Sequence, residues 1–308
     1  PPPPAEKPGP GPPGVDPGAF APGAPADRPA RLLAAADRIA AAPPTGAFGR
    51  DEALAVEALR EFAAATGPRV VFVGKLIVSK GVDLLAAAWP LIHREDPGAR
   101  LLIAGFGAYE IGLRALVTAL EDGDLEAARH IAEEGGGREG GEPAPLEYLR
   151  SFLAAPPAGY LGAARAAAGS VSFSGRLEHD EVAAVVPCAD AMVVPSTFPE
   201  AFGMVAAEAA ASGALPVCAD HSGLAEVTAV LGREVPAVRG LIGFGRGPGA
   251  VGEIAAKVGG WLALAPAERA GIGLNIAECA DRNWSWRGVA EDVISASAGE
   301  VRPVRQPT

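Results

Sequence analysis

Two acidic residues, Glu200 and Glu208, are separated by seven positions in a segment with the composition of a ligand site. Glu200 follows Pro199 in a loop, and Glu208 falls within a helix expected to begin near Gly203. Carboxylate oxygens accept hydrogen bonds from sugar hydroxyls, and the amides and dipole at a helix start attract anions. The segment therefore predicts a site for an anionic ligand with hydroxyl groups. Glu200 as a simple cap and a solvent-facing Glu208 fit the spacing equally well.

Two lysines and two glycines follow the first expected strand: Gly74, Lys75, Lys80 and Gly81. Gly74 permits a tight turn, and Gly81 opens a helix whose first turn is electropositive. Since both lysines lie in one strand-to-helix turn, both can reach one diphosphate. The spacing differs from that of a P-loop. Taken alone, the residues favour the alternative, which is two solvated surface lysines.

Two further segments give weaker signals. Gly105-Phe106-Gly107 begins like a dinucleotide fingerprint, but Glu110 stands where a third glycine is needed, which favours a plain turn. The acids around His179 suit a metal less well than a helix start, where Asp180 and Glu181 meet free amides.

Asp122-Gly123-Asp124 has the spacing of a metal-binding pair, but it lies between two hydrophilic helical stretches. We therefore expect a solvated turn there. His221, in another polar turn, either orients a ligand or lies exposed in its loop. Neither segment predicts a metal site.

These candidates follow short apolar runs that have the length of strands. The runs occupy 70–73, 101–104, 171–173, 191–194 and 214–218. Helical stretches follow them at roughly 80–94, 109–120, 180–187, 203–212 and 223–231. Strands that are apolar on both faces and alternate with helices predict an α/β fold with a doubly wound parallel sheet. Ligands of such sheets bind beyond the carboxyl ends of the strands.

The remaining segments define the organisation of the chain. Residues 1–30 hold 12 Pro and 5 Gly, which predicts a disordered or extended linker. Residues 31–66 are expected to form a helical linker of two helices, broken at Pro43-Pro44, ahead of a domain at 67–300. Within that domain, 121–165 is a partly helical insertion, and three helices follow near 250–264, 266–280 and 286–297. We expect the tail, 301–308, to be frayed.

Composition excludes several classes of protein. A net charge of −11 disfavours a nucleic-acid binder, which needs a basic face. No apolar run is long enough to span a membrane, and no signal peptide is visible. Cys188, Cys218 and Cys279 show neither metal nor disulfide spacing. We read them as reduced thiols and expect a cytoplasmic protein.

The segment from Glu200 to Glu208 resembles the E-x7-E motif of retaining glycosyltransferases with the GT-B fold, the family-4 type. The resemblance covers roughly residues 68–298. Further segments resemble landmarks of that family and stand in the family's order along the chain: Val73-Gly74-Lys75-Leu76, Lys80-Gly81, Phe173-Ser174-Gly175-Arg176-Leu177, Pro195-Ser196, Ser222-Gly223-Leu224-Ala225-Glu226-Val227 and Trp284-Ser285-Trp286. Pro12–Asp16 and Phe20-Ala21-Pro22 resemble the segment that joins the two GT-B domains.

The resemblance implies the Rossmann-like, C-terminal half of a GT-B enzyme, which transfers a sugar from a nucleotide-diphosphate sugar with retention. The resemblance also implies that the enzyme needs no metal or cofactor. The acceptor would be a sugar, a lipid or a small molecule. An N-terminal domain, expected ahead of this chain, would supply acceptor contacts and any contact with a membrane surface. This chain alone would bind the donor weakly and turn over little.

The resemblance also implies a role for each matched residue. Gly74 would shape the phosphate loop, Lys75 and Lys80 would neutralise the donor diphosphate, and the Leu177 backbone would contact the base. Glu200 would contact the sugar at the reacting centre. The amides of the helix start would bind sugar and phosphate, and Glu208 would hold the ribose hydroxyls. Those amides belong to Ala201, Phe202, Gly203, Met204 and Val205.

Two departures and two alternatives accompany the resemblance. Lys75 stands where the family usually has Arg, so a bidentate phosphate contact is lost. Pro13 replaces the usual Asn before Gly14. The main alternative is a non-catalytic nucleotide-binding or scaffold module. A nicotinamide oxidoreductase would rest on Gly105-Phe106-Gly107 alone.

Overall fold

The sheet confirms the predicted fold class. The computed structural model describes residues 14–41 and 50–297. Six parallel strands lie in the order β3-β2-β1-β4-β5-β6. They are β1 (Arg69–Val73), β2 (Arg100–Ala104), β3 (Val171–Gly175), β4 (Ala191–Val194), β5 (Leu215–Ala219) and β6 (Gly243–Phe244). Strand β6 could not be predicted from the sequence, because a two-residue strand beginning with glycine has no apolar pattern.

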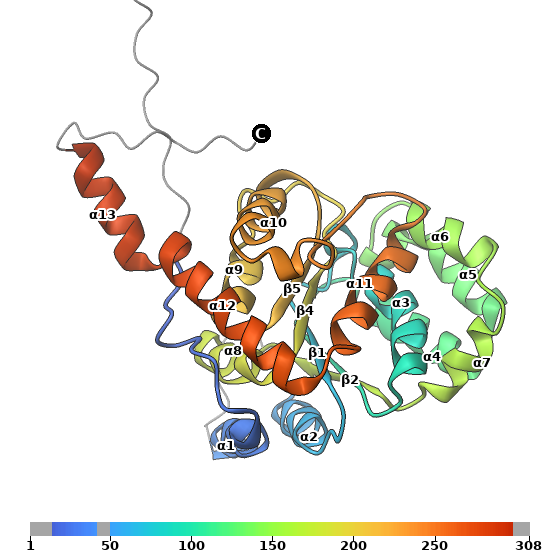
Figure 1. Ribbon diagram of the computed structural model, residues 1–308. Helices are drawn as coiled ribbons and strands as arrows, with labels where there is room; N and C mark the ends of the chain where they lie inside the picture. Colours follow the sequence, from blue (N-terminus) through green and yellow to red (C-terminus); the bar gives the residue numbers. More distant parts are fainter. Residues whose placement is uncertain (1–13, 42–49, 298–308) are drawn as a thin grey trace, which may run out of the picture.

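Helices cover both faces of the sheet (Figure 1). One layer contains α3 (Val82–Glu95), α4 (Glu110–Asp122) and α11 (Ala250–Leu262). The opposite layer contains α2 (Glu52–Ala63), α8 (His179–Val185), α9 (Met204–Ala211) and α12 (Pro266–Trp284). Helix α10 (Ser222–Glu234), which connects β5 to β6, contacts β5, α9 and α12, while α1 (Arg28–Ala41) packs on α2.

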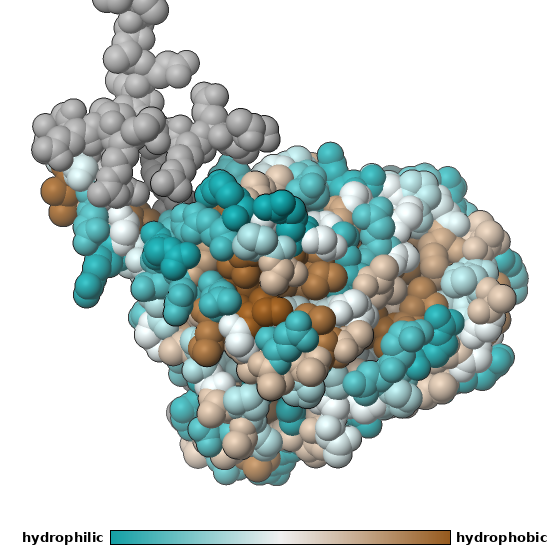
Figure 2. Space-filling model, viewed as in Figure 1, coloured by the Kyte–Doolittle hydropathy of each residue, from teal (hydrophilic) through white to brown (hydrophobic). Residues whose placement is uncertain are grey.

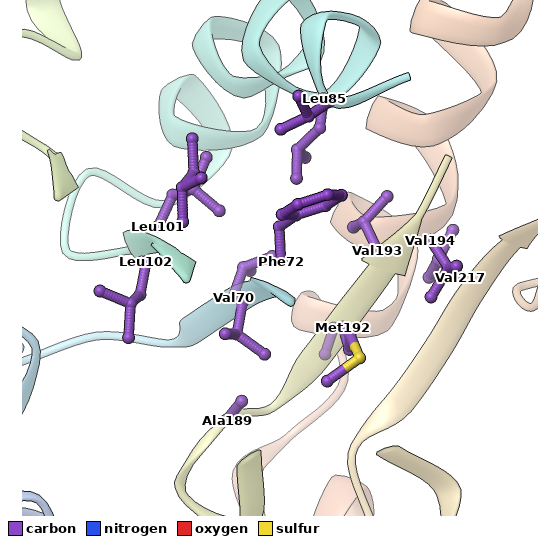
Figure 3. Packing of buried hydrophobic residues seen from close by; sticks show 14 of the residues in the cluster. Val70, Phe72, Leu85, Leu101, Leu102, Ala189, Met192, Val193, Val194 and Val217 are labelled. Carbon is purple, nitrogen blue, oxygen red and sulfur yellow. The ribbon is translucent and has the colours of Figure 1, made fainter. Parts of the chain in front are cut away.

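The strands are buried on both faces, which explains their continuous apolar sequences. Val70, Phe72 and Met192 are at most 2 % exposed. Figure 3 shows Phe72 pointing toward Leu85 of α3, with Val193 of β4 nearby. On the face seen in Figure 2, hydrophobic residues gather near the centre, and hydrophilic residues are spread around them.

The described part of the predicted N-terminal linker packs on the domain. Val15 donates to the carbonyl of Trp284 and accepts from the amide of Trp286, with N···O distances of 2.7 and 3.1 Å. Phe20 is 1 % exposed, and its ring lies 5.5 Å from that of His179. Residues 14–30 therefore differ from a disordered or extended linker, because burial of these two side chains fixes the chain despite its Pro and Gly content. Residues 1–13 and the break at Pro43-Pro44 lie outside the described residues.

The predicted insertion is mostly helical. It contains α5 (Leu125–Glu134), α6 (Glu147–Ala154) and α7 (Tyr160–Ala166). Its Tyr160 hydroxyl donates to the carbonyl of Ala87 in α3 over 2.8 Å, and Leu149 and Leu153 are fully buried. The Gly-rich stretch within it forms a short 3-10 turn, Gly136–Glu139. The insertion is thus packed against α3 and α4.

Helices also end the described chain. After α12 comes α13 (Trp286–Ser297), which extends away from the body in Figure 1. The long α12 continues to Trp284, past its expected end near 280. Across the two described ranges, no helix combines the length and apolar character that crossing a bilayer requires.

Glycines allow the loops at the carboxyl ends of the strands to touch through their backbones. Gly81, at φ +64°, lies so close to Pro195 that a Cβ would collide with the Pro195 carbonyl oxygen. A Cβ on Gly105 would likewise collide with the carbonyl of Gly74. The loop after β1 is therefore held by backbone contact with the loops after β2 and β4. This contact accounts for Gly105-Phe106-Gly107 without a dinucleotide.

Gly81→Ala is expected to destabilise the fold by roughly 2–5 kcal/mol, because it adds both a left-handed backbone penalty and a steric clash. Gly271→Ala, in the open middle of α12, is the control and should stabilise by up to about 1 kcal/mol. Urea unfolding of both variants measures the difference. Equal stability of the two variants would contradict the close loop contact.

Candidate functional site

The candidate site lies where the sheet reverses its winding direction, between β1 and β4. The loops that follow these neighbouring strands are joined by hydrogen bonds to one acceptor, the carbonyl of Ser79 in the loop after β1. It accepts from the amides of Thr197 and Phe198 at 2.9 and 3.3 Å. In parallel sheets of this kind, ligands bind at such a reversal point.

Lys80 and Glu200 meet at this point. The Lys80 ammonium forms an ion pair with Glu200 Oε1, and the Ser196 hydroxyl donates to the same oxygen over 2.7 Å. The Lys80 and Glu200 side chains are 31 % and 21 % exposed, so the pair remains open to solvent on one side. The two residues singled out from separate loops therefore lie in direct contact.

The loop after β5 supports Glu200 from behind. The Ser222 hydroxyl accepts from the Glu200 amide over 2.9 Å, and the Gly223 amide donates to the Glu200 carbonyl over 3.0 Å. Ser222 has φ +49° and is the one non-glycine residue with positive φ in the described ranges. His221 lies 2.7 Å from the Ser196 carbonyl through Nε2 and 3.0 Å from the Ser222 hydroxyl through Nδ1. His221 therefore joins two loops within the protein.

The start of α9 provides backbone amides beside this pair. Its N-cap, Gly203, makes no side-chain capping bond, and a Cβ there would lie 2.7 Å from Leu224 of α10. Ala201 is exposed, while Phe202 is half-buried with its ring 6.4 Å from that of Trp284. Met204 and Val205, both half-buried, form the first turn. The first amides of α9 thus have no side-chain cap from their own N-cap residue, as an anion site requires.

Glu208 lies in the second turn of α9 and is half-buried. Burial raises the pKa of its carboxyl, and the nearby His179 charge lowers it. Leu177, also half-buried, lies two positions before His179 in the loop after β3. The start of α8, which carries His179, therefore lies near the Glu208 carboxyl.

The remaining predicted site residues lie in the loop after β1. Gly74 continues the sheet, since its amide donates to the carbonyl of Ala104 over 3.1 Å. Lys75 is exposed and has no ion-pair partner among the described residues. Its charge is therefore available at the edge of the site.

The other acidic candidates cap helices. Glu178 and Glu181 form a reciprocal capping box at the start of α8, as the helix-start interpretation of that segment required. Asp124 caps α5 by accepting from the Ala127 amide over 2.9 Å. Within the described residues, no group of three or more His, Cys, Asp or Glu side chains could hold a metal. Cys188, Cys218 and Cys279 are buried free thiols.

A second polar cluster lies at the opposite edge of the sheet and holds helix ends together. Asp190 accepts from the Arg69 amide at 2.9 Å and from Arg28 Nη1 at 3.0 Å. The Arg69 guanidinium donates to the carbonyls of Phe62, Ala63 and Ala65 at the end of α2. The guanidinium groups of Arg28 and Arg69 therefore stabilise the fold.

The sequence analysis missed a buried acid next to the site. Asp83, in the first turn of α3, is 3 % exposed, and burial raises its carboxyl pKa to about 7. Tyr109 lies close by, and burial followed by the Asp83 charge raises the pKa of its hydroxyl. The position of Asp83 three residues after Lys80 was the available signal.

Comparison with known proteins agrees with this geometry. Residues 161–232, which contain Leu177, Glu200 and Glu208, match the family described as glycosyl transferases group 1. The chain is also similar to glycogen synthase of Mycobacterium tuberculosis, with 32 % identity over 162 residues, covering 52 % of this chain and 28 % of that protein. The matched part thus spans under a third of the relative.

Two solved structures share the fold. The chain resembles Anabaena HepE in complex with UDP-glucose at 15 % identity and a TM-score of 0.51, covering 93 % of this chain and 56 % of HepE. It resembles the C-terminal domain of a glycosyl transferase group 1 family protein from Francisella tularensis at 16 % identity and a TM-score of 0.51, covering 89 % and 100 %. At these identities the likeness concerns the fold alone.

Ser222 gives a prediction about strain behind Glu200. Ser222→Ala removes the acceptor of the Glu200 amide, which costs about 1–2 kcal/mol, and keeps the left-handed backbone. Ser222→Gly removes the same acceptor but relieves about 1–2 kcal/mol of backbone strain. Thermal unfolding should therefore rank the Ala variant below the Gly variant. The reverse order would show that Ser222 is not strained.

Asp83 gives a pH dependence. Its raised pKa means that the folded chain holds this proton more tightly than the unfolded chain, so stability falls as pH rises from about 4 to about 7. Asp83→Asn stays neutral and is expected to be more stable than the parent at pH 8, with a smaller difference at pH 5. Urea unfolding at both pH values measures this, with the exposed Asp281→Asn as control. A gain that is equal at both pH values would contradict the prediction.

Proposed function

We propose that this chain is the donor-binding half of a glycosyltransferase that uses a nucleotide-diphosphate sugar. The observation that carries the proposal is the contact between Lys80 and Glu200 at the reversal point of the sheet, beside the start of α9. The group 1 family match supports sugar transfer. HepE, which shares the fold, binds UDP-glucose, and this supports a nucleotide sugar as the ligand.

Each residue has a physical role in this proposal. Negative charge grows on the leaving diphosphate as the glycosidic bond breaks, and Lys75, Lys80 and the α9 amides stabilise that charge. Glu200 contacts the donor sugar at the reacting centre. Glu208 accepts hydrogen bonds from the ribose, and the backbone at Leu177 contacts the base.

The proposal extends to the reaction as a whole. Two cationic side chains and a helix start neutralise the diphosphate without a metal ion. We propose that the reaction retains the anomeric configuration, as the family-4 resemblance of the Glu200–Glu208 segment implies. We also propose a cytoplasmic enzyme in which a second, N-terminal domain binds the acceptor.

Removal of the cation tests the donor site. Lys80→Ala is expected to weaken UDP, ADP or GDP binding by about 10–100-fold, because a charge-assisted hydrogen bond is lost. Titration calorimetry measures this, with Lys257→Ala on α11 as the control. Equal affinity of the parent and the Lys80 variant would refute the proposal.

Glu200→Gln separates binding from chemistry. The variant should bind the nucleoside diphosphate at least as tightly as the parent, because Lys80 loses its competing carboxylate. Nucleotide release from UDP-glucose or ADP-glucose in the presence of acceptor and acceptor domain should fall by at least about 100-fold. Nucleotide binding without turnover in the unaltered protein would instead indicate a scaffold module.

A further inference from the structure

The Lys80 turn lacks a cap of its own. Val78–Lys80 is a three-residue 3-10 turn, and the side chain of its N-cap residue, Ile77, makes no capping bond. The Val78 amide donates instead to Glu139 Oε1 over 2.5 Å. Glu139 comes from the insertion, 61 residues further along the chain. The insertion therefore reaches the loop that carries Lys80.

The insertion holds Glu139 firmly in this position. Glu139 ends the turn Gly136–Glu139, which is flanked by Gly135 at φ +40° and Gly140 at φ +86°. The Gly136 amide donates to the Ala144 carbonyl over 2.9 Å, which closes the loop. These bonds fix the backbone from which the Glu139 side chain extends.

Arg138 anchors the same turn on α4. It forms an ion pair with Glu134 at 2.5 Å. Its Cδ lies against Gly112 of α4, where an added Cβ would be 3.1 Å from it. Tyr109, beside Gly112, donates its amide to the carbonyl of Leu76 over 2.9 Å. The insertion, α4 and the loop after β1 thus form one continuous packed unit.

The far end of the Lys80 turn is held by the loop after β4, through the Ser79 carbonyl. The turn is therefore fixed at its start by Glu139 and near its end by the amides of Thr197 and Phe198. Lys80 is the last residue of this turn. A long flexible side chain binds an anion better when its backbone is already ordered, because less entropy is lost on binding.

We propose that Glu139 is a positioning residue for Lys80, and that the insertion serves to order the phosphate-binding turn. The consequence for ligand binding rests on the proposed donor function. Glu139 acts as a hydrogen-bond acceptor for the Val78 amide, so an uncharged acceptor of the same shape can replace it. Its negative charge is not what the turn requires.

Three variants test this inference by calorimetry with UDP. Glu139→Ala is expected to weaken binding about 5-fold, in line with the loss of a helix cap. Glu139→Gln retains the acceptor and should stay within about 2-fold of the parent. Glu142→Ala, an exposed acid of the same insertion, is the matched control and should bind like the parent. Tighter binding by both Glu139 variants would show that only its charge matters, and unchanged binding would show no coupling; either result overturns the inference.

Hydrogen exchange separates this inference from the donor function itself. Amides in residues 76–81 should exchange faster in Glu139→Ala than in Glu139→Gln, Glu142→Ala or the parent. Failure of the parent to bind UDP, ADP or GDP refutes the donor site, whereas the exchange rates still report the cap. Equal rates in all four proteins overturn the positioning role, whatever the nucleotide result.

Discussion

The carbonyl of Ser79 joins the loops that follow β1 and β4, at the point where the sheet reverses its winding direction. Strands β1 and β4 are neighbours, yet their following helices leave toward opposite faces, so the two loops diverge immediately after the strands. Hydrogen bonds from the amides of Thr197 and Phe198 to the Ser79 carbonyl hold them together against this divergence. The contact between Lys80 and Glu200 depends on these hydrogen bonds, because Lys80 directly follows Ser79 and Glu200 lies three positions after Thr197.

Hydrogen bonds from two other parts of the chain support the contact between these loops. Ser222 and Gly223 hold the backbone of Glu200, and His221 ties their loop to Ser196. On the other side, the insertion meets the loop after β1 through Glu139. The side chains open to solvent are thus carried by a rigid backbone, which favours preorganised recognition of a small anionic ligand.

The sequence predicted the architecture because the sheet is buried on both faces. Runs such as 70–73 and 191–194 are apolar throughout, and their order with the helices leaves few topologies. The same reasoning placed Lys80 and Glu200 at one edge of the sheet, and the structure brings them into contact. Their assigned roles, and those of Lys75, Leu177 and Glu208, stay predictions.

Other features depend on contacts between distant segments and leave no local pattern. The left-handed backbone of Ser222 arises from the neighbouring loops, since serine has no intrinsic preference for it. Glu139 meets Val78 only because the insertion folds back over α4. The burial of Val15 and Phe20 could not be predicted either, because Pro and Gly content indicates only the preference of the backbone. It says nothing about what two apolar side chains pack against.

The pairing of Lys80 with Glu200 has a consequence for the binding of anions. The cation and the carboxylate neutralise each other, so a passing chloride or acetate ion meets little attractive field at this spot. A ligand that binds the Lys80 ammonium must therefore compete with Glu200 for it, and the carboxylate that it displaces keeps the Ser196 hydroxyl as a donor.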